Sequence, residues 1–304
     1  MEDIKEKTDF KAGFVSITGA PNAGKSTLLN HILGEKISII SKKPQTTRNK
    51  ILGIAHRPNS QIIFIDTPGI HKPNRALNTG MVEQAVNVMG DVDIILFVID
   101  VSYPSVESED IILNKLISQN KDSILILNKI DLIQKPILLE FIDNWSKKYP
   151  FKAIIPISAL KGDGIEDMLK TIDSFIPLGS PLYPDDAITD VTMRFIASEI
   201  IREKIFNLTG EELPYATAVT IESFTENLEK NLTSIHATIH VEKDSQKGII
   251  IGKGGSKLKS IGESARMELE YKIETKVFLK LFVRVEKNWS RDTKAMRRLG
   301  YYNK

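Results

Sequence analysis

The stretch GAPNAGKST, from Gly19 to Thr27, constrains the fold of this chain more than any other feature. It follows an apolar run at 13–18 and opens a segment at 25–33 with helical periodicity. Its two glycines, with Lys25 and Ser26 after the second, form the phosphate-binding loop pattern, in which backbone N–H groups converge on phosphate at a helix N-terminus. The sequence therefore predicts a strand-turn-helix unit that binds a phosphorylated ligand.

The N-terminal part of the chain alternates short apolar runs with amphipathic segments. The runs are nearly continuous in Ile, Leu and Val, which is typical of strands buried on both faces of a mostly parallel sheet that helices cover. This pattern predicts an α/β fold. We expect strands at 13–18, 50–55, 61–66, 93–100, 123–128 and 153–157, and helices near 25–33, 78–89, 106–119, 135–148 and 164–175.

The pattern changes at IPLGSPLYPDD, whose three prolines and paired acidic residues predict a linker. We therefore expect an N-terminal domain at 1–178, a linker at 179–189 and a small α+β domain at 190–304. In that domain we expect a helix near 190–207, strands near 216–224 and 233–242, a glycine turn flanked by GIII and a helix near 256–271, a strand near 276–286 and a short basic helix in the tail. The glycine turn is expected to join two helices, so the order is helix, strand, strand, helix, helix, strand.

Composition is that of a soluble globular protein, with 41% hydrophobic and 26% charged residues in 304. Because cysteine is absent, disulfides and thiolate metal sites are excluded, and we expect a cytoplasmic protein. The start, MEDIKEKTDFK, lacks the apolar segment of a signal peptide. The longest apolar run is far shorter than the about 20 residues of a membrane-spanning helix, so only peripheral membrane contact stays open.

Charge is distributed unevenly along the chain. From Lys247 to Lys304 there are 15 Lys and Arg against 6 Asp and Glu, whereas residues 1–246 hold 26 against 33. This asymmetry favours a polyanionic partner for the C-terminal part, or a solvated basic face, and charge alone leaves both open.

The tetrapeptide NKID, at the end of the expected strand 123–128, indicates which base is bound. A carboxylate at Asp131 accepts from both guanine N1–H and the exocyclic amine, and adenine offers neither donor. Asn128 is expected to tether neighbouring loops and the base edge, and the Lys129 stem to pack along the ring. The SAL sequence at Ser158 to Leu160 supports this reading by offering a backbone N–H to guanine O6.

The DTPG sequence closes the expected strand 61–66. Asp66 is placed to hold Mg²⁺ through water and the Gly69 N–H to meet the γ-phosphate, although DTPG alone is also a good turn. Lys25 is expected at the β/γ-phosphates and the Ser26 hydroxyl on Mg²⁺. Four such elements on successive strand ends predict a GTPase domain with GTP or GDP and Mg²⁺ as ligands. The expected nucleotide contacts are Gly19, Pro21, Asn22, Ala23, Gly24, Lys25, Ser26, Thr27, Asp66, Thr67, Pro68, Gly69, Asn128, Lys129, Asp131, Ser158, Ala159 and Leu160.

In order and almost without gaps, the chain resembles the Era family of TRAFAC-class GTPases. The motifs are GAPNAGKSTLLN, KPQTTRNKILGI, DTPGIHKP, NKIDL, SALKGDGI, GIIIGKGGSKLKSIGESAR, VFLKLFVRVEKNW and RRLGY. The resemblance implies a P-loop GTPase domain followed by a type II KH domain. It also implies a role in assembly of the 30S subunit through the 3′ end of 16S rRNA, a monomer, and contact with the inner-membrane surface as an open expectation.

The hydrolytic machinery departs from the Ras-like pattern at Ile70, which stands where a glutamine would orient the attacking water. Another group must position the water, so we expect slow intrinsic turnover. Asn22 matches the loop asparagine with which related GTPases bind K⁺, or it only stabilises the loop. In switch I, both Thr46 and Thr47 are candidates for the Mg²⁺ ligand. The expected catalytic set is Lys25, Thr46, Thr47, Asp66 and Gly69.

The second glycine turn, within GIIIGKGGSKLK, is neither a P-loop nor a dinucleotide fingerprint. It fits the GxxG loop of a KH module, where missing side chains let an RNA backbone approach a helix N-terminus. Alone it is weak evidence, but the order of elements, the basic balance and the family resemblance all favour RNA binding. The expected RNA contacts are Ile249, Ile250, Ile251, Gly252, Lys253, Gly254, Gly255 and Lys257, with the isoleucines as an apolar floor for bases.

Other conspicuous residues have plainer interpretations. His236 and His240 lack acidic partners at metal-ligand spacing, and Trp289 and Tyr271 are expected to pack rather than to stack on bases. Two functions stay open: a GTP-hydrolysing switch that controls an RNA-binding module, or an RNA-binding assembly factor with GTP as a structural ligand.

Overall fold

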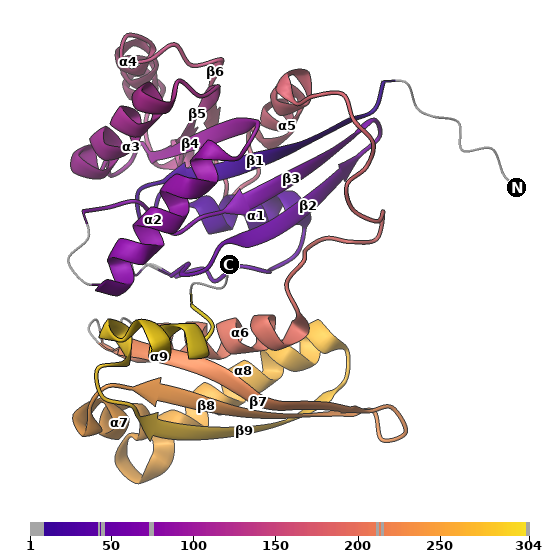
Figure 1. The fold of residues 1–304 in the computed structure, drawn as a ribbon, viewed down its shortest axis with the longest axis vertical. Coiled ribbons are helices and arrows are strands. Elements are labelled where there is room, and N and C mark those ends of the chain that lie inside the picture. The colour runs from indigo at the N-terminus through magenta and orange to yellow at the C-terminus, as the bar shows by residue number, and fades with distance from the viewer. Residues whose placement is uncertain are drawn as a thin grey trace, which may run out of the picture. The chain divides into compact units, whose positions relative to one another are not determined.

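The computed structural model describes residues 9–41, 43, 46–72, 76–210, 213 and 216–301. Contacts divide the chain into two compact units (Figure 1). The first holds Met1–Ser38, Thr47–Pro73 and Met81–Asp190, and the second Ile39–Thr46, Asn74–Gly80 and Val191–Lys304. The second unit thus begins after Asp190 and also takes in two short N-terminal segments, which the sequence pattern does not anticipate.

A six-stranded sheet in the order β2-β3-β1-β4-β5-β6 forms the centre of the first unit. Neighbouring strands are parallel, except that β2 runs antiparallel to β3, so the mostly parallel sheet is confirmed. The strands are β1 (Lys11–Gly19), β2 (Ile51–Arg57), β3 (Ser60–Asp66), β4 (Ile94–Asp100), β5 (Ser123–Asn128) and β6 (Ala153–Ile157).

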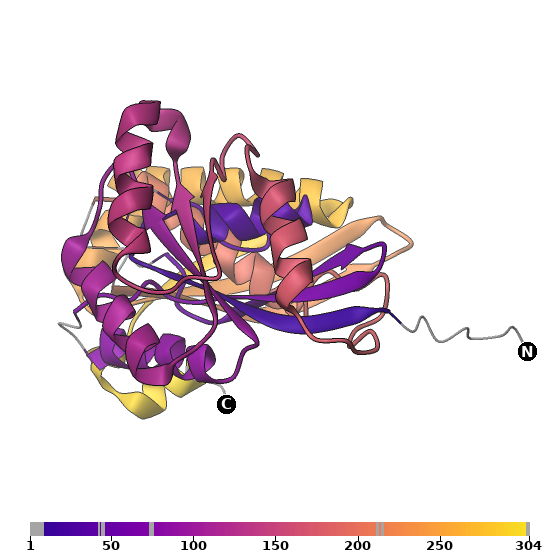
Figure 2. The same cartoon turned by 90° about the horizontal axis from the view of Figure 1, so that it is seen from above.

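Helices lie on both faces of this sheet (Figure 2). Every side chain of β4 from Ile94 to Ile99 is buried, as expected for a strand covered on both sides. On one face, Met89, Leu116 and Trp145 from three different helices share a hydrophobic cluster with Phe97. The helices are α1 (Lys25–Leu33), α2 (Ala76–Gly90), α3 (Val106–Gln119), α4 (Lys135–Ser146) and α5 (Ile165–Phe175).

The segment expected as a linker is tied to the edge of the sheet. The Ile54 amide donates to the Ile188 carbonyl at 2.9 Å, and the Gln61 side chain accepts from the amides of Leu182 and Tyr183. Among the described strands, β2 has no neighbour on its outer side, so the Ile54–Ile188 bond satisfies part of its edge. The segment expected as a linker is therefore ordered and is hydrogen-bonded to β2 and β3.

The second unit contains a three-stranded sheet in the order β7-β8-β9, with β8 antiparallel to β7 and parallel to β9. Its core combines alternate strand residues, such as Ile235 and Ala237, with Ile201, Ile250 and Ala265 from three helices. The expected order of helix, strand, strand, helix, helix and strand is confirmed. The elements are α6 (Met193–Leu208), β7 (Thr217–Asn227), β8 (Leu232–Val241), α7 (Asp244–Ile251), α8 (Ser256–Ile273), β9 (Lys276–Val285) and α9 (Thr293–Arg298).

None of the helices in the described part of the chain is both long and apolar enough to cross a membrane.

Candidate nucleotide site and RNA-binding loop

The first glycine turn connects β1 to α1. A Cβ at Gly19 would lie 2.3 Å from the Val98 carbonyl oxygen, and one at Gly24 would lie 2.2 Å from Asn128 Nδ2. Asn22 and Gly24 both have positive φ, 64° and 95°, so the backbone turns sharply before the helix begins. Both glycines are therefore required by close packing as well as by an approaching phosphate.

Lys25, the first residue of α1, lies inside this loop. Its Nζ donates to the carbonyl oxygens of Gly19 at 3.1 Å and Ala20 at 2.8 Å. Burial lowers the pKa of Lys25 to about 8, and the attraction of Asp66 only partly offsets that effect. The ammonium group is thus a poorly solvated cation, which a phosphate would stabilise.

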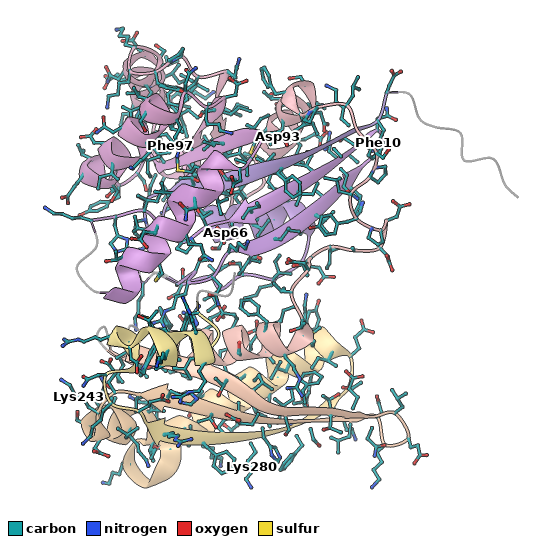
Figure 3. All side chains as sticks on the ribbon, in the orientation of Figure 1. Phe10, Asp66, Asp93, Phe97, Lys243 and Lys280 are labelled. Carbon is teal, nitrogen blue, oxygen red and sulfur yellow. The ribbon has the colours of Figure 1, made fainter. Side chains whose placement is uncertain are left out.

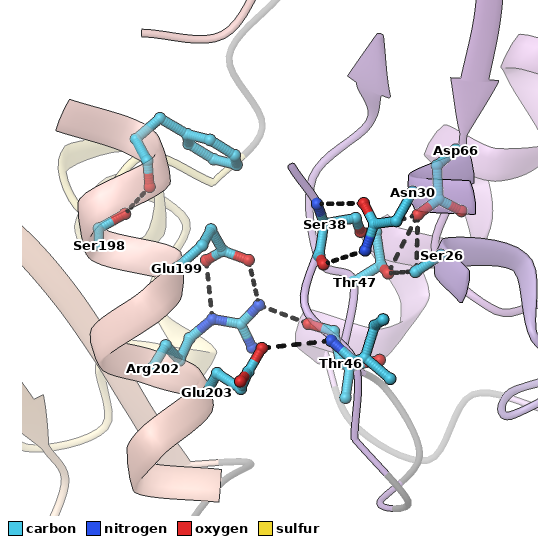
Figure 4. Close-up of polar contacts among 12 residues, drawn as sticks. Ser26, Asn30, Ser38, Thr46, Thr47, Asp66, Ser198, Glu199, Arg202 and Glu203 are labelled. Carbon is cyan, nitrogen blue, oxygen red and sulfur yellow. Dashed lines mark hydrogen bonds and ion pairs between the residues drawn. The ribbon is translucent and has the colours of Figure 1, made fainter. Parts of the chain in front are cut away.

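Oxygen atoms from three segments gather around Asp66, which ends β3 (Figure 3). Ser26 Oγ donates to Asp66 Oδ2 at 2.7 Å and lies 2.8 Å from Thr47 Oγ1, and Ser38 Oγ also donates to Oδ2, at 3.0 Å (Figure 4). Burial raises the pKa of Asp66, and its Oδ1 has no hydrogen-bond partner among the residues that the structure describes. Hydroxyl and carboxylate oxygens with spare acceptor capacity suit Mg²⁺, so these residues fit the expected ion.

The two candidate threonines of switch I make different contacts. The Thr47 hydroxyl lies 3.5 Å from Asp66 Oδ2, within the oxygen cluster. Thr46 instead offers its carbonyl to Arg202 Nη2 on α6, and Glu199 accepts from the same guanidinium at 2.6 and 2.8 Å (Figure 4). The sequence left both threonines open, and the geometry favours Thr47 as the metal ligand.

Asn128 joins three loops at the carboxyl edge of the sheet. Its Nδ2 donates to the Ala23 carbonyl at 2.7 Å, and its Oδ1 accepts from the Ala159 amide at 3.0 Å. The side chain is fully buried, so both bonds are shielded from water. The tethering role expected for Asn128 is therefore present in the structure.

The other NKID and SAL residues surround this tether. Lys129 has a positive φ of 68° and pairs with Asp100, while the Asp131 carboxylate lies 4.0 Å from Lys161 Nζ. The Ala159 amide, one candidate donor to guanine O6, is used by Asn128, and the Leu160 side chain is 77% exposed. Asp131 is thus a nearly buried carboxylate at the edge where the loop motifs meet.

The DTPG segment packs directly on the first glycine turn. A Cβ at Gly69 would lie 2.8 Å from Pro21 Cα, and the Ile70 amide donates to the Gly19 carbonyl at 3.1 Å. Thr67 is buried and donates to the Ile17 carbonyl at 3.0 Å. The Ile70 side chain lies fully within the hydrophobic core. It therefore cannot orient a water molecule, as its chemistry already indicated.

The second glycine turn joins α7 to α8. Gly252, Gly254 and Gly255 all have positive φ, and a Cβ at Gly252 would lie 2.8 Å from Lys257 Cβ. Lys253 and Gly254 are exposed, and a Cβ at Gly254 would meet only open space. The loop thus presents bare backbone and one lysine at the N-terminus of an 18-residue helix, where an anion is favoured.

Two expectations for single residues are wrong. Ile250 is fully buried in the core of the second unit, so its side chain cannot serve as a floor for bases, whereas Ile249 is 46% exposed. Tyr271, expected to pack, is 87% exposed on α8. Trp289 does pack, since its indole Nε1 donates to the Ala216 carbonyl at 3.2 Å. In each case the face of the helix that packs on the sheet, which the sequence does not show, decides the outcome.

Three further residues of this region are Ser38, Asn30 and Arg202, which the sequence motifs do not include. Asn30 Oδ1 accepts from the Ile37 and Ser38 amides at 3.0 Å, which positions Ser38 beside Asp66. The signal for Asn30 in the sequence is a polar residue within the apolar run LLNHIL of a helix. Arg202 is 1% exposed on α6, and no sequence pattern marks it.

Comparison with known proteins agrees with this geometry. Residues 14–129 match the family model of the 50S ribosome-binding GTPase, and residues 212–290 match that of the KH domain. GTPase Era of Geobacter metallireducens is 52% identical over 292 residues, which are 96% of this chain and 98% of that protein. A variant of Aquifex aeolicus Era bound to GDP·AlF4⁻ is 44% identical, with a TM-score of 0.91 over 96% of this chain and 99% of that one. The same values hold for Era in complex with MgGDPNP and nucleotides 1506–1542 of 16S ribosomal RNA.

The fold and the two loops define a P-loop GTPase that carries a C-terminal KH domain. At about half identity over nearly the whole length of its relatives, the chain belongs to the Era family of GTPases.

Proposed function

We propose that this chain is a GTP-hydrolysing switch that binds the 3′ end of 16S rRNA through its KH domain and assists assembly of the 30S subunit. The observation that carries the proposal is a full set of nucleotide-binding groups in one unit and an exposed GxxG loop in the other. The Era structure with MgGDPNP and 16S rRNA nucleotides supports both halves.

In the nucleotide site, Lys25 would leave the carbonyls of its own loop for the β/γ-phosphate oxygens, which would stabilise its charged form. Ser26 and Thr47, with their hydroxyls, and the Asp66 carboxylate would hold Mg²⁺. When bound, the ion neutralises charge on the phosphate oxygens. Asp131 accepts the two guanine donors, and Asn128 keeps the loops in register for the base.

Ile70 cannot position the attacking water, because its side chain is in the core. We propose K⁺ as the missing positive charge, with Asn22 as its side-chain ligand at the turn of the loop. Asn22 is exposed and has a positive φ of 64°, so the loop presents it outward. Intrinsic turnover is slow in this account.

Consecutive residues connect the nucleotide site to α6. Thr47 belongs to the oxygen cluster around Asp66, and the preceding Thr46 carbonyl is held by Arg202. Lys43, in the same segment, donates to the Phe206 and Thr209 carbonyls near the end of α6. If Thr47 moved to bind Mg²⁺, the attached residues Lys43 and Thr46 would move with it. Through their hydrogen bonds, GTP binding would influence the RNA-binding unit.

In the KH unit, Lys253 and the first amides of α8 meet RNA phosphates, and Ile249 offers exposed apolar surface to a base. We expect the protein to be a monomer that acts in the cytoplasm and that also contacts the inner-membrane surface peripherally.

A binding and turnover assay tests the proposal. Fluorescein-labelled RNA from the 3′ end of 16S rRNA is titrated with protein loaded with GDPNP or GDP, and an RNA of equal length from the large subunit is the comparator. We expect preference for the 16S RNA and phosphate release from GTP that changes when this RNA is added. Equal affinity for both RNAs contradicts the small-subunit assignment, and turnover that ignores RNA contradicts the switch.

A further inference from the structure

The sheet of the second unit has one face covered by helices and one open face. Alternate residues of β9, including Val277, Leu279 and Leu281, pack in the core with α6, α7 and α8. The residues between them point the other way, and Phe278 and Phe282 are 52% and 47% exposed. Two large aromatic side chains close together on one open face make that face a candidate for contact with a partner.

The neighbours of these rings are polar or basic. In the parallel register, Ser234, His236 and Thr238 of β8 lie opposite Phe278, Lys280 and Phe282, in that order. The His236 ring meets the Phe278 ring edge-on at 6.2 Å, and Lys280 Nζ lies 5.0 Å from the centre of the Phe282 ring. The surface is therefore an alternation of aromatic and cationic side chains, and Lys280 lies on the side of the sheet away from α6 (Figure 3).

In the described part of the chain, other residues cover the far end of this face and leave the rest open. His240 is 5% exposed there, with Thr220 at 2.8 Å and Glu286 at 3.1 Å, and Arg298 of α9 pairs with Glu286. This cover stops short of Phe282, which stays about half exposed. A ligand could therefore reach Phe278, Lys280 and Phe282 without displacing any described part of the chain.

The chemistry of the open face selects its ligand. Aromatic side chains on a sheet stack unpaired bases, and lysine or arginine between them meets the phosphates. Phe278 and Phe282 are four residues apart on one strand, about 13 Å, with Lys280 between them. An apolar protein or a lipid would be better served by aliphatic side chains, but those of β9 all point into the core.

We propose that the open face of the β7–β9 sheet, formed by Phe278, Lys280, Phe282 and Arg284, is a second site for single-stranded RNA. Bases stack on the two phenylalanines, and the two cations contact the backbone between and beyond them. The GxxG loop joins helices that pack on the opposite, covered face, so the two sites hold different stretches of RNA. The inference rests on the proposed RNA-binding function of this unit.

Aromatic truncation tests the proposal directly. Phe278→Ala with Phe282→Ala should weaken binding of a single-stranded RNA long enough to reach both sites by about 10- to 100-fold. Phe278→Leu with Phe282→Leu keeps apolar bulk and should lose most of the same affinity. Tyr271→Ala removes an even more exposed ring elsewhere in the unit and should bind as wild type does. Retained affinity in the leucine pair would show apolar docking and overturn the proposal.

The cationic side chains have their own readout. Lys280→Gln with Arg284→Gln should reduce the steepness of log affinity against log salt by about 1.4, the value for two lost contacts to a single strand. An unchanged slope would contradict phosphate contacts on this face.

A loop variant separates this inference from the proposed function. Lys253→Asp with Gly254→Asp disables the GxxG loop, and RNA binding that remains in this background should depend on Phe278 and Phe282. If only the loop variant loses RNA and the alanine pair binds normally, the second site is overturned and the KH function stands. If the loop variant binds RNA normally, the KH function itself is wrong. Thermal unfolding and GDP binding of each variant establish that it is folded.

Discussion

Removal of the Asn128 side chain should weaken guanine-nucleotide binding strongly, because this one side chain makes two buried hydrogen bonds to neighbouring loops. Asn128→Ala deletes a bond to the Ala23 carbonyl at 2.7 Å and one from the Ala159 amide at 3.0 Å. Both alanines are buried, at 1% and 2% exposure, so neither backbone group regains water easily. Each unpaired group costs about 1–3 kcal/mol, and a combined loss of about 2–6 kcal/mol corresponds to about 30- to 20,000-fold in affinity if it falls on the bound state.

Displacement of a fluorescent GDP analogue, followed by stopped flow, measures this loss. Asn144→Ala makes the same chemical change at an exposed position of α4 and should bind as wild type does. Asn128→Asp keeps the acceptor for Ala159 but sets a carboxylate against the Ala23 carbonyl, so it should rescue little. If Asn128→Ala binds GDP within twofold of wild type and unfolds at the same temperature, the tether does not organise the site.

Three further predictions concern the same site. Asp131→Asn should weaken GTP binding by about 1–3 kcal/mol and improve XTP binding in a competition assay, and unchanged GTP affinity would refute the guanine assignment. Because phosphate favours the charged form of Lys25, whose pKa is about 8, nucleotide affinity should be full at lower pH and fall as pH rises through that value. Calorimetry near pH 8 in two buffers of different ionisation heat should therefore show proton uptake, and none would contradict the buried ammonium. Hydrolysis should be faster in K⁺ than in Na⁺, and Asn22→Ala should abolish the difference, whereas equal rates in wild type would remove the K⁺ hypothesis.

The gathering of the nucleotide motifs was predictable from sequence for a physical reason. Parallel strands end at one edge of a sheet, so residues that follow β1, β3, β5 and β6 must meet there. The contacts of Asn128 with Ala23 and Ala159 show this directly. The order of elements in the second unit was equally readable, because its strands alternate and its helices are separated by glycines.

Details that depend on tertiary packing could not be predicted. Thr46 and Thr47 are chemically identical neighbours, so the sequence cannot distinguish them. The structure does, because the Thr46 carbonyl accepts from Arg202, which is 156 residues away in the sequence. Three consecutive isoleucines give no clue that Ile250 alone is fully buried. The open face of the second sheet was also missed, because alternation shows which residues share a face and not whether that face is covered.

The central claim is that the first glycine turn binds the phosphates of GTP and the second binds the phosphates of RNA. Titration of both ligands on variants of both turns tests this claim most directly. Lys253→Asp with Gly254→Asp is compared with Lys253→Asn and Gly254→Asn, which has nearly the same shape without the charge, and with Lys25→Ala. Gly254 has a φ of 59° and open space at its Cβ, so aspartate and asparagine both fit there. GTP and the 16S 3′-end RNA are titrated on every full-length variant by fluorescence anisotropy at one stated salt concentration. We expect the aspartate pair to lose RNA binding by about a hundredfold or more and to keep GTP, and the asparagine pair to lose much less RNA affinity. Lys25→Ala should lose GTP and bind RNA as nucleotide-free wild type does. An aspartate pair that binds RNA as tightly as wild type would contradict the central claim.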